Sequence, residues 1–524
     1  MSTKTAPPEG DRGGYRKELG SRQVQMIGLG GAIGTGLFLG SATRMASTGP
    51  ALLISFAVVG FIAFLMMRAL GELVLHRPTS GAFVSYMREF YGERAAYITG
   101  WCYWVNWALT GIAELSAVAL YVRYWWPDVP SWLTVIIGVA AVVTVNLLSV
   151  KVFGEFEFWA SLLKVGAIVL FLVVGIVLVV FSVHIGGTGY QASIANLWQN
   201  PGGFWPTSDP YVWYGPVLVM SGVVFSYAAI EMVGVAAGEM KNPEREVPRA
   251  VNSVVVRILV FYIGSIFLLM CTLPTSVYGT TVHGAAVSPF VTVFSMLGAG
   301  WIGNVIQGIL IIAAMSSLNS GLYVTGRILR SLGLSKQAPA FTAKMSSTGV
   351  PWAGIAMTGA VFLLGAVLNA AYPNQAFDIA LEVSAIGTLA TWFSLFVCQL
   401  RLRRLSNAGI IPASPFRMPF YPYGSYIGLV FLALVVVGMV ISGWQSSPDF
   451  WGKTDFITIV IGVPVLALLM WLGWFLVKRN VAEHTGGKLD SRWPKLDRNG
   501  RPLQDLVPAA GPADERHDLT DERI

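Results

Sequence analysis

Three ionisable side chains interrupt long apolar runs of this sequence. Glu114 lies in NWALTGIAELSAVALYV, Lys164 in SLLKVGAIVLFLVVG and Glu231 in VVFSYAAIEMVGVAAG. An ionisable residue at membrane depth costs at least ~2.5 kcal/mol to insert, so it indicates function. We expect Lys164 and Glu231 to carry protons, because burial makes such groups readily change protonation state. Two alternatives remain: the Lys164 stem reaches to the membrane surface, or Glu231 accepts hydrogen bonds from a neighbouring helix. Glu114 could contact a solute or a helix partner.

The stretch GLGGAIGTGLF (28–38) has glycine at five of its eleven positions. A dinucleotide-binding loop is excluded, because the G-x-G-x-x-G spacing is missing and no strand precedes the stretch. Close helix packing through Gly30/Gly34 and Gly36/Gly40 remains. The other alternative is a discontinuous helix that exposes backbone at mid-membrane. A second polar interruption, at Ser226, Tyr227 and Glu231, favours the discontinuous helix.

Two broken helices side by side suit one kind of solute. A break leaves free N–H groups at the start of one half-helix and free C=O groups at the end of the other. The N–H groups attract a carboxylate and the C=O groups attract an ammonium. This pattern indicates a zwitterion, of which α-amino acids are the common example.

The elements that position these residues are membrane helices. The chain of 524 residues is 54% hydrophobic and only 12% charged, about half the charge of a soluble domain. We predict an all-α integral membrane protein, with apolar runs long enough to cross a bilayer of about 30 Å. The twelve predicted spans are 25–48, 51–75, 97–126, 131–150, 158–182, 213–238, 252–274, 290–325, 352–371, 376–400, 422–445 and 456–477.

Basic residues predict the orientation of these spans. They gather before helix one and after helices two, six, eight and ten, whereas the alternate loops offer little beyond Arg44, Arg123 and Lys453. By the positive-inside rule both termini are cytoplasmic. The residues that carry this argument are Lys4, Arg12, Arg16, Lys17, Arg22, Arg77, Arg88, Arg94, Lys241, Arg245, Arg249, Arg327, Arg330, Lys336, Lys344, Arg401, Arg403 and Arg404.

The segments outside the spans predict no further domain and no metal site. We expect cytoplasmic tails at 1–24 and 478–524, the latter mobile because it is charged and poor in aromatic residues. The three cysteines and five histidines are scattered, which predicts neither a disulfide framework nor a metal or cofactor site.

Four motifs together resemble the amino acid transporter family of the amino acid–polyamine–organocation superfamily, over roughly residues 20 to 480. They are GGAIGTGLF, RALGELVLHRPTSGAFVSYMREFYG, FSYAAIEMVGVAAGEMKNPEREVP and SSLNSGLYVTGRILRSLG. Within that family, RQVQMIGLGGAIGTGLFLGS, NWALTGIAELSAVALYVRYW and EFEFWASLLKVGAIV are most similar to bacterial L-asparagine permeases. Glu114 departs from the Asp expected there, which keeps the charge and adds one methylene.

The resemblance implies the fold and the site. It implies a LeuT-like core of two inverted five-helix repeats (25–182 and 213–400), with discontinuous helices one and six and two peripheral helices (422–477). Ala32, Ile33, Gly34, Thr35 and Gly36 take the positions that hold the substrate carboxylate through backbone N–H groups. Phe225, Ser226 and Ala228 take those that contact the amino group and gate the site. Lys164 takes the place of the sodium ion of sodium-coupled relatives, between helices one and eight.

Other polar residues offer side-chain selectivity. Ser and Thr in membrane helices more often bond their own backbone or a neighbouring helix. For each candidate taken alone, such a structural hydrogen bond is therefore favoured over a contact with the substrate. Besides Glu114, the candidates are Ser316, Ser317 and Asn319 in helix eight and Ser384, Thr388 and Thr391 in helix ten.

The predicted function is proton-coupled import of a neutral amino acid, L-asparagine, across a bacterial plasma membrane by alternating access. The proton is the expected coupling ion, and no cofactor is expected. The expected partners are the amino acid substrate and the lipid bilayer, and nucleic acid is not expected. A permease or exchanger for another small amino acid (GABA, proline, serine or alanine) is the nearest alternative. A membrane-embedded enzyme or a nutrient sensor is disfavoured, because the histidines do not cluster and the tails are short.

Overall fold

A computed structural model describes residues 33–494 and 496. The gaps within this range are 80, 149, 187–188, 200–202, 206–212, 238–239, 241, 280, 283–284, 348, 446–453 and 495. The predicted tail 1–24, the start of helix one including Ala32, and the basic residues Lys241 and Lys453 therefore lie outside the described residues.

Helices dominate the first half of the chain. Its elements are α2 (Thr35–Phe38), α3 (Gly40–Thr48), η1 (Gly49–Ala51), α4 (Leu52–His76), α5 (Ala82–Tyr91), α6 (Glu93–Arg123), α7 (Ser131–Leu148), α8 (Val150–Val180), β1 (His184–Ile185), β2 (Tyr190–Gln191), α9 (Asn196–Gln199), α10 (Gly215–Leu218), α11 (Met220–Ser226), α12 (Met232–Ala236), α13 (Pro243–Arg257) and η4 (Ile258–Gly264), a π-helical stretch.

The second half continues in the same way. Its elements are α14 (Ser265–Thr272), η5 (Thr275–Gly279), β3 (Thr281–Val282), β4 (Ala285–Ala286), α15 (Pro289–Met296), α16 (Gly300–Leu334), η6 (Ala340–Ala343), α17 (Trp352–Phe362), α18 (Leu364–Ala371), α19 (Ala376–Asn407), α20 (Tyr423–Gln445), α21 (Thr454–Ile457), η8 (Thr458–Gly462), also π-helical, and α22 (Val463–His484).

Within the described residues, ten helices are long and apolar enough to cross a membrane. The first of them, Gly40–His76, combines the end of predicted helix one with helix two. Predicted helix six is not among the ten, because it is divided into α10, α11 and α12. The predicted span 290–325 is wrong as a single helix, because Gly298, at φ 76, turns the chain between the short α15 and the long α16.

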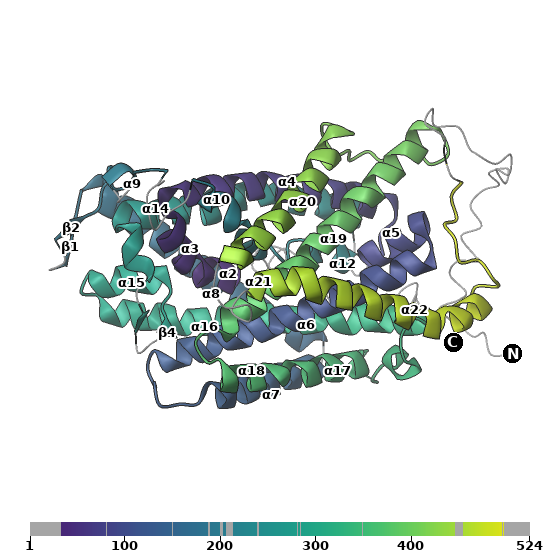
Figure 1. Cartoon of the computed structure of the whole chain (residues 1–524), viewed down its shortest axis with the longest axis horizontal. Helices are drawn as coiled ribbons and strands as arrows, with labels where there is room; N and C mark the ends of the chain where they lie inside the picture. Colours follow the sequence, from purple (N-terminus) through teal and green to yellow (C-terminus); the bar gives the residue numbers. More distant parts are fainter. Residues whose placement is uncertain are drawn as a thin grey trace, which may run out of the picture.

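The long helices lie side by side along the long axis of the molecule, with the β1–β2 hairpin and α9 at one end and α5 at the other (Figure 1). β1 and β2 pair antiparallel, with His184 opposite Gln191. α6 packs against both α16 and α19. In the most apolar 18-residue stretch of α6, 83% of residues are buried, against 6% in the last span. α6 is therefore central, and α22 faces outward.

The segment after α22 packs against the corner between α5 and α6. Glu93 N donates to Leu489 O (2.9 Å), and Gly92, at φ 88, leaves room there, because a Cβ would lie 2.5 Å from that oxygen. Ser491 Oγ donates to Glu89 O (2.9 Å). The prediction of a mobile tail from Lys478 is therefore wrong for its first part, because α22 continues to His484 and hydrogen bonds hold the residues beyond it.

Candidate functional site

In the described part of helix one, the end of the glycine-rich stretch is not one continuous α-helix. Gly34 is extended (φ −125, ψ −164), and α2 begins at Thr35. The N–H groups of a first helical turn have no acceptors within the helix. α2 ends after four residues, and Leu39 separates it from α3. Of the residues predicted to hold a carboxylate, Ile33 to Gly36 thus lie at an interruption, and Ala32 lies outside the described residues.

Helix six is broken as the sequence predicts. α11 ends at Ser226, residues 227–231 form turns, and α12 begins at Met232. Ala229 is left-handed, at φ 73, a conformation that alanine rarely adopts. Tyr227 and Glu231 do not share a helical face, because the segment between them is not helical.

The two breaks lie against each other. A Cβ added at Gly36 would lie 2.8 Å from Ser226 Cα and 2.9 Å from the Phe225 ring. Only glycine allows this approach of the two backbones. The structure thus brings Gly36 together with Phe225 and Ser226. The resemblance assigns Gly36 to the carboxylate of the zwitterionic solute, and Phe225 and Ser226 to its amino group. The Ser226 hydroxyl donates to Gly222 O (3.1 Å), within its own helix.

Glu114 of α6 lies beside the break in helix one. A Cβ at Gly34 would lie 2.9 Å from Glu114 Oε1 and 3.4 Å from Ser317 Oγ. Glu114 is buried, and its Oε2 has no hydrogen-bond partner among the described residues. A buried carboxylate oxygen without a donor is unfavourable, so this position is available to a donor from a solute or from water.

Glu231 lies in the break of helix six. It is buried, and neither of its carboxyl oxygens has a hydrogen-bond partner within the part of the chain that the structure describes. The indole of Trp392 in α19 and the backbone of Ala229 nonetheless interact with this carboxyl, so its alternative role, as an acceptor for a neighbouring helix, stays a prediction. Tyr227, in contrast, is structural: its hydroxyl donates to Phe56 O (2.9 Å), and its ring stacks on Tyr262.

Lys164 is fully buried in α8. Its Nζ donates to Ser316 Oγ of α16 (2.9 Å), and Ser316 Oγ donates to Glu157 Oε1 (2.8 Å). Nζ also lies 3.9 Å from the Glu157 carboxylate. The alternative in which Lys164 reaches to the membrane surface is wrong, because a polar cluster inside the bundle holds the ammonium.

Sequence reasoning missed Glu157, although a signal was present. Glu157 precedes Lys164 by seven residues, and positions i and i+7 lie on the same face of a helix. Two carboxylates in EFEF are unusual at the start of so apolar a helix.

The remaining polar candidates mostly form hydrogen bonds within the helix bundle. This is the structural role that the sequence favours for each of them taken alone. Ser384 and Thr391 donate to carbonyls of their own helix, Leu381 O (2.9 Å) and Gly387 O (2.9 Å). Asn319 Oδ1 accepts from Asn146 (2.6 Å). Thr388 lies 3.5 Å from Asn106 Oδ1, too long for a strong bond.

Comparison with known proteins identifies the family. The amino acid permease family matches residues 23–485. L-asparagine permease 1 of Mycobacterium bovis is 48% identical, over 90% of this chain and 92% of its own. The L-asparagine permease of Streptomyces coelicolor is 45% identical, over 93% of this chain and 95% of its own, and that of Escherichia coli 46%, over 90% of each. The chain belongs to the amino acid permease family. The resemblance predicted from the motifs is confirmed, and the permease is a transporter, not an enzyme.

In this permease an ion pair ties three helices together near the breaks. Arg44 of α3 lies 2.9 Å from Glu382 of α19, and a Cβ at Gly222 of α11 would meet the Arg44 guanidinium at 1.8 Å. Arg44 is buried, so its prediction as a loop charge is wrong. The pair links both broken helices to α19.

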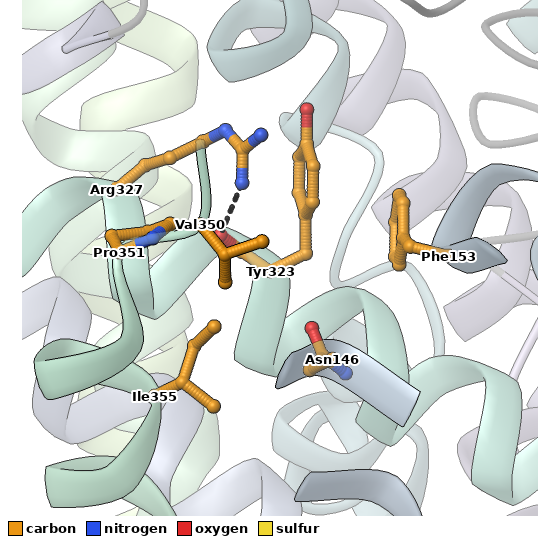
Figure 2. Close-up of a pocket in the computed structure, with 7 residues that line it drawn as sticks. All are labelled: Asn146, Phe153, Tyr323, Arg327, Val350, Pro351 and Ile355. Carbon is orange, nitrogen blue, oxygen red and sulfur yellow. Dashed lines mark hydrogen bonds between the residues drawn. The ribbon is translucent and has the colours of Figure 1, made fainter. Parts of the chain in front are cut away.

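Arg327 also departs from its prediction as a surface anchor of the permease. α16 continues to Leu334, and Arg327 is buried. Its guanidinium lies 3.3 Å from the centre of the Tyr323 ring, whose other face stacks on Phe153 (4.2 Å). Figure 2 shows these three side chains in a row along a small pocket that Asn146 and the loop residues Val350 and Pro351 also line.

Proposed function

We propose that this permease imports a neutral amino acid, L-asparagine, by proton-coupled symport with alternating access. The observation that carries the proposal is the approach of the two breaks at Gly36 and Ser226. Backbone groups from both half-helices can then reach one solute that lies beside this contact. The relatives named L-asparagine permeases favour asparagine as that solute.

The substrate contacts follow from the breaks. The carboxylate binds N–H groups between Ala32 and Gly36, and the ammonium binds carbonyls near Phe225, Ser226 and Ala228. Among the residues predicted for side-chain selectivity, Glu114 is favoured for the amide, since it lies next to Gly34 and has a carboxyl oxygen without a donor. Ser384 is already bonded inside the bundle. Asn319 Oδ1 accepts from Asn146, but Asn319 Nδ2 has no hydrogen-bond partner among the described residues, so Asn319 stays a second candidate.

We place this chain in a bacterial plasma membrane with twelve spans and both termini in the cytoplasm. The ten long helices and the interrupted helices one and six support this number. The excess of basic residues on alternate loops supports the orientation.

Lys164 and Glu231 are the proposed proton-coupling residues. Both side chains are buried next to the discontinuous helices or next to helices that pack against them. In such a low-dielectric interior, a change of charge strongly affects how the helices pack. One proton moved across 100 mV supplies roughly 2.3 kcal/mol. That energy supports about 40-fold accumulation of substrate at ~1.4 kcal/mol per tenfold.

Uptake of radiolabelled L-asparagine into liposomes containing the purified permease tests the function. We expect an inward proton gradient to drive accumulation, and unlabelled asparagine to compete better than GABA, proline, serine or alanine. Uptake that requires preloaded amino acid and ignores the gradient would instead identify an exchanger. Equal competition by the other amino acids would overturn asparagine as the substrate.

Lys164→Ala tests the coupling residue in the same liposomes. The variant removes the ammonium, so gradient-driven uptake is expected to disappear while the protein still inserts. Lys336→Ala, outside the bundle helices, is the control and is expected to transport like the wild type. Undiminished uptake by Lys164→Ala would limit Lys164 to a structural role.

A further inference from the structure

Glu157 is a buried acid that the proposed transport steps leave unused. It lies in α8 with no exposed surface, beside an equally buried Lys164. Its Oε1 accepts from Ser316 (2.8 Å) and lies within reach of Ser161 (3.3 Å). Its Oε2 has no hydrogen-bond partner among the described residues. The carboxylate is thus only partly satisfied in a medium where charge is unfavourable.

Few other charged groups face this pair from the helices around it. α6 contributes Glu114, which acts electrostatically on Lys164. α16 contributes Ser316 and, further along, Tyr323. η4, which packs against α8, carries the buried Tyr262, and the buried Arg257 ends α13 just before it. Lys164 therefore has an acid on each side: Glu114 next to the break of helix one, and Glu157 within α8 itself.

We propose that Glu157 is the second proton site of the transport cycle and takes the proton that Lys164 releases. The inference rests on the proposed proton coupling through Lys164. It adds the group that accepts the proton from Lys164, which the proposed function does not name. Ser316 joins the two groups by two hydrogen bonds, 2.9 Å and 2.8 Å long, in one direction. A proton can follow these bonds without crossing a gap.

The transfer balances without any further reactant. Lys164 Nζ gives a proton to Ser316 Oγ, which gives its own proton to Glu157 Oε1. The products are a neutral amine, an unchanged hydroxyl and a neutral carboxylic acid. The pair has no net charge before or after the step, so the low-dielectric interior does not oppose it as it would oppose a lone charge.

The position of Glu157 gives the proton a direction. The backbone of Glu157 lies seven residues closer than that of Lys164 to the start of α8, about 10 Å along the axis at ~1.5 Å per residue, and the Lys164 side chain reaches back so that Nζ lies 3.9 Å from the Glu157 carboxylate. In the proposed topology α8 begins at the cytoplasmic side. Glu157 is therefore on the way from Lys164 to the cytoplasm, where an acid that loses its proton resets the pair.

Glu157→Gln tests the inference in asparagine-transporting liposomes. We expect accumulation to fall from about 40-fold at 100 mV to about equal concentrations inside and out. We also expect asparagine exchange without a gradient to lose the pH dependence that the wild type shows, which a merely structural role would not remove. Glu155→Gln, the same change two residues earlier in α8, is the control and should match the wild type.

Two further variants keep the test decisive if Glu157→Gln does not fold. Glu157→Asp retains a titratable carboxyl and is expected to retain gradient-driven uptake with a displaced pH profile. Ser316→Ala removes the bridging hydroxyl and is expected to slow gradient-driven uptake more than exchange.

The outcomes separate this inference from the proposed function. If the wild type ignores the proton gradient, the proposed coupling is wrong. If the wild type responds and Glu157→Gln accumulates asparagine and follows pH as the wild type does, only the role of Glu157 is overturned. The same holds if Glu157→Asp behaves like Glu157→Gln, because a titratable group would then not be needed.

Discussion

At the scale of single residues, the glycines of helix one do different things. Gly36 is needed because backbone of another helix occupies the space of a side chain there. Gly34 faces a carboxylate and a hydroxyl. The sequence showed that glycine was concentrated here, but not which neighbour each one met.

Gly36→Ala should therefore impair transport. The added methyl group would meet Ser226 Cα at 2.8 Å, and backbone cannot move aside as a flexible side chain can. Overpacking of this kind costs about 1–3 kcal/mol, so we expect asparagine uptake to fall at least about fivefold.

Gly166→Ala in α8 is the matched control. Nothing lies within 4 Å of the added Cβ, and alanine favours a helix by about 1 kcal/mol. We expect unchanged uptake and equal or higher thermal stability. Equal loss of uptake in both variants would contradict the close approach of the two breaks.

At the scale of elements, the interruption of helix six depends on one unusual residue. Ala229 adopts φ 73 between α11 and α12. Nothing in its residue type predicts this conformation, because alanine strongly favours a helix. The tertiary structure holds it there, and the buried turn carries Glu231.

Ala229→Gly should stabilise the permease. Glycine adopts this conformation without the roughly 1–2 kcal/mol that it costs other residues, although it also loses more entropy on folding. We expect a net gain of about 0.5–1 kcal/mol, measured by thermal unfolding in detergent. Ala167→Gly, in regular α8, should instead lose about 1 kcal/mol. If both variants lose stability equally, Ala229 is not left-handed in the folded protein.

At the scale of the whole molecule, the segment after α22 connects the last span to α5 and to the end of α4. Trp493 Nε1 donates to Glu89 Oε1 (3.0 Å), and His76 Nε2 lies 3.0 Å from the same oxygen. Arg77 is 3.1 Å from Oε2. Burial alone would raise the pKa of Glu89, but the hydrogen bonds of His76 and Trp493 and the charge of Arg77 lower it to about 2.

This lowered pKa predicts how stability depends on pH. The ordinary pKa of the carboxyl is 4.5, so the unfolded chain takes up the proton first. The stabilisation by Glu89 is therefore complete above about pH 4.5 and is lost as the pH falls towards about 2. We expect the Tm in detergent to fall over this range in the wild type. In Glu89→Gln it should be lower at neutral pH and should lack this part of the pH dependence.

Glu483→Gln is the control for that measurement. Glu483 pairs with Arg479 on the surface of α22, where both side chains are mostly exposed, and such pairs contribute little. Its Tm should follow the wild type at every pH. Parallel curves for Glu89→Gln and the wild type would contradict the role of Glu89.

The sequence by itself determined the class of the protein, most helices and their approximate ends. In a bilayer, the backbone of a long apolar run can satisfy its hydrogen bonds in few ways other than a helix. The hydrophobic pattern of each run therefore predicts its helix without knowledge of the rest of the chain. The interruption of helix six and the burial of Lys164 and Glu231 were readable for the same reason, because polar residues in such runs stand out. The motifs identified the family.

Only the tertiary structure decided which of these residues meet. Glu157 and Lys164 share a helix, but Ser316, which joins them, comes from α16. Glu114 reaches Gly34 from α6, Arg44 reaches Glu382 from α3, and the segment after α22 reaches Glu89. Each contact joins segments far apart in the sequence, and it depends on how each helix is rotated and packed against its neighbours. The rotation and packing of each helix depend on all the other helices, so these contacts cannot be predicted from any single stretch of sequence.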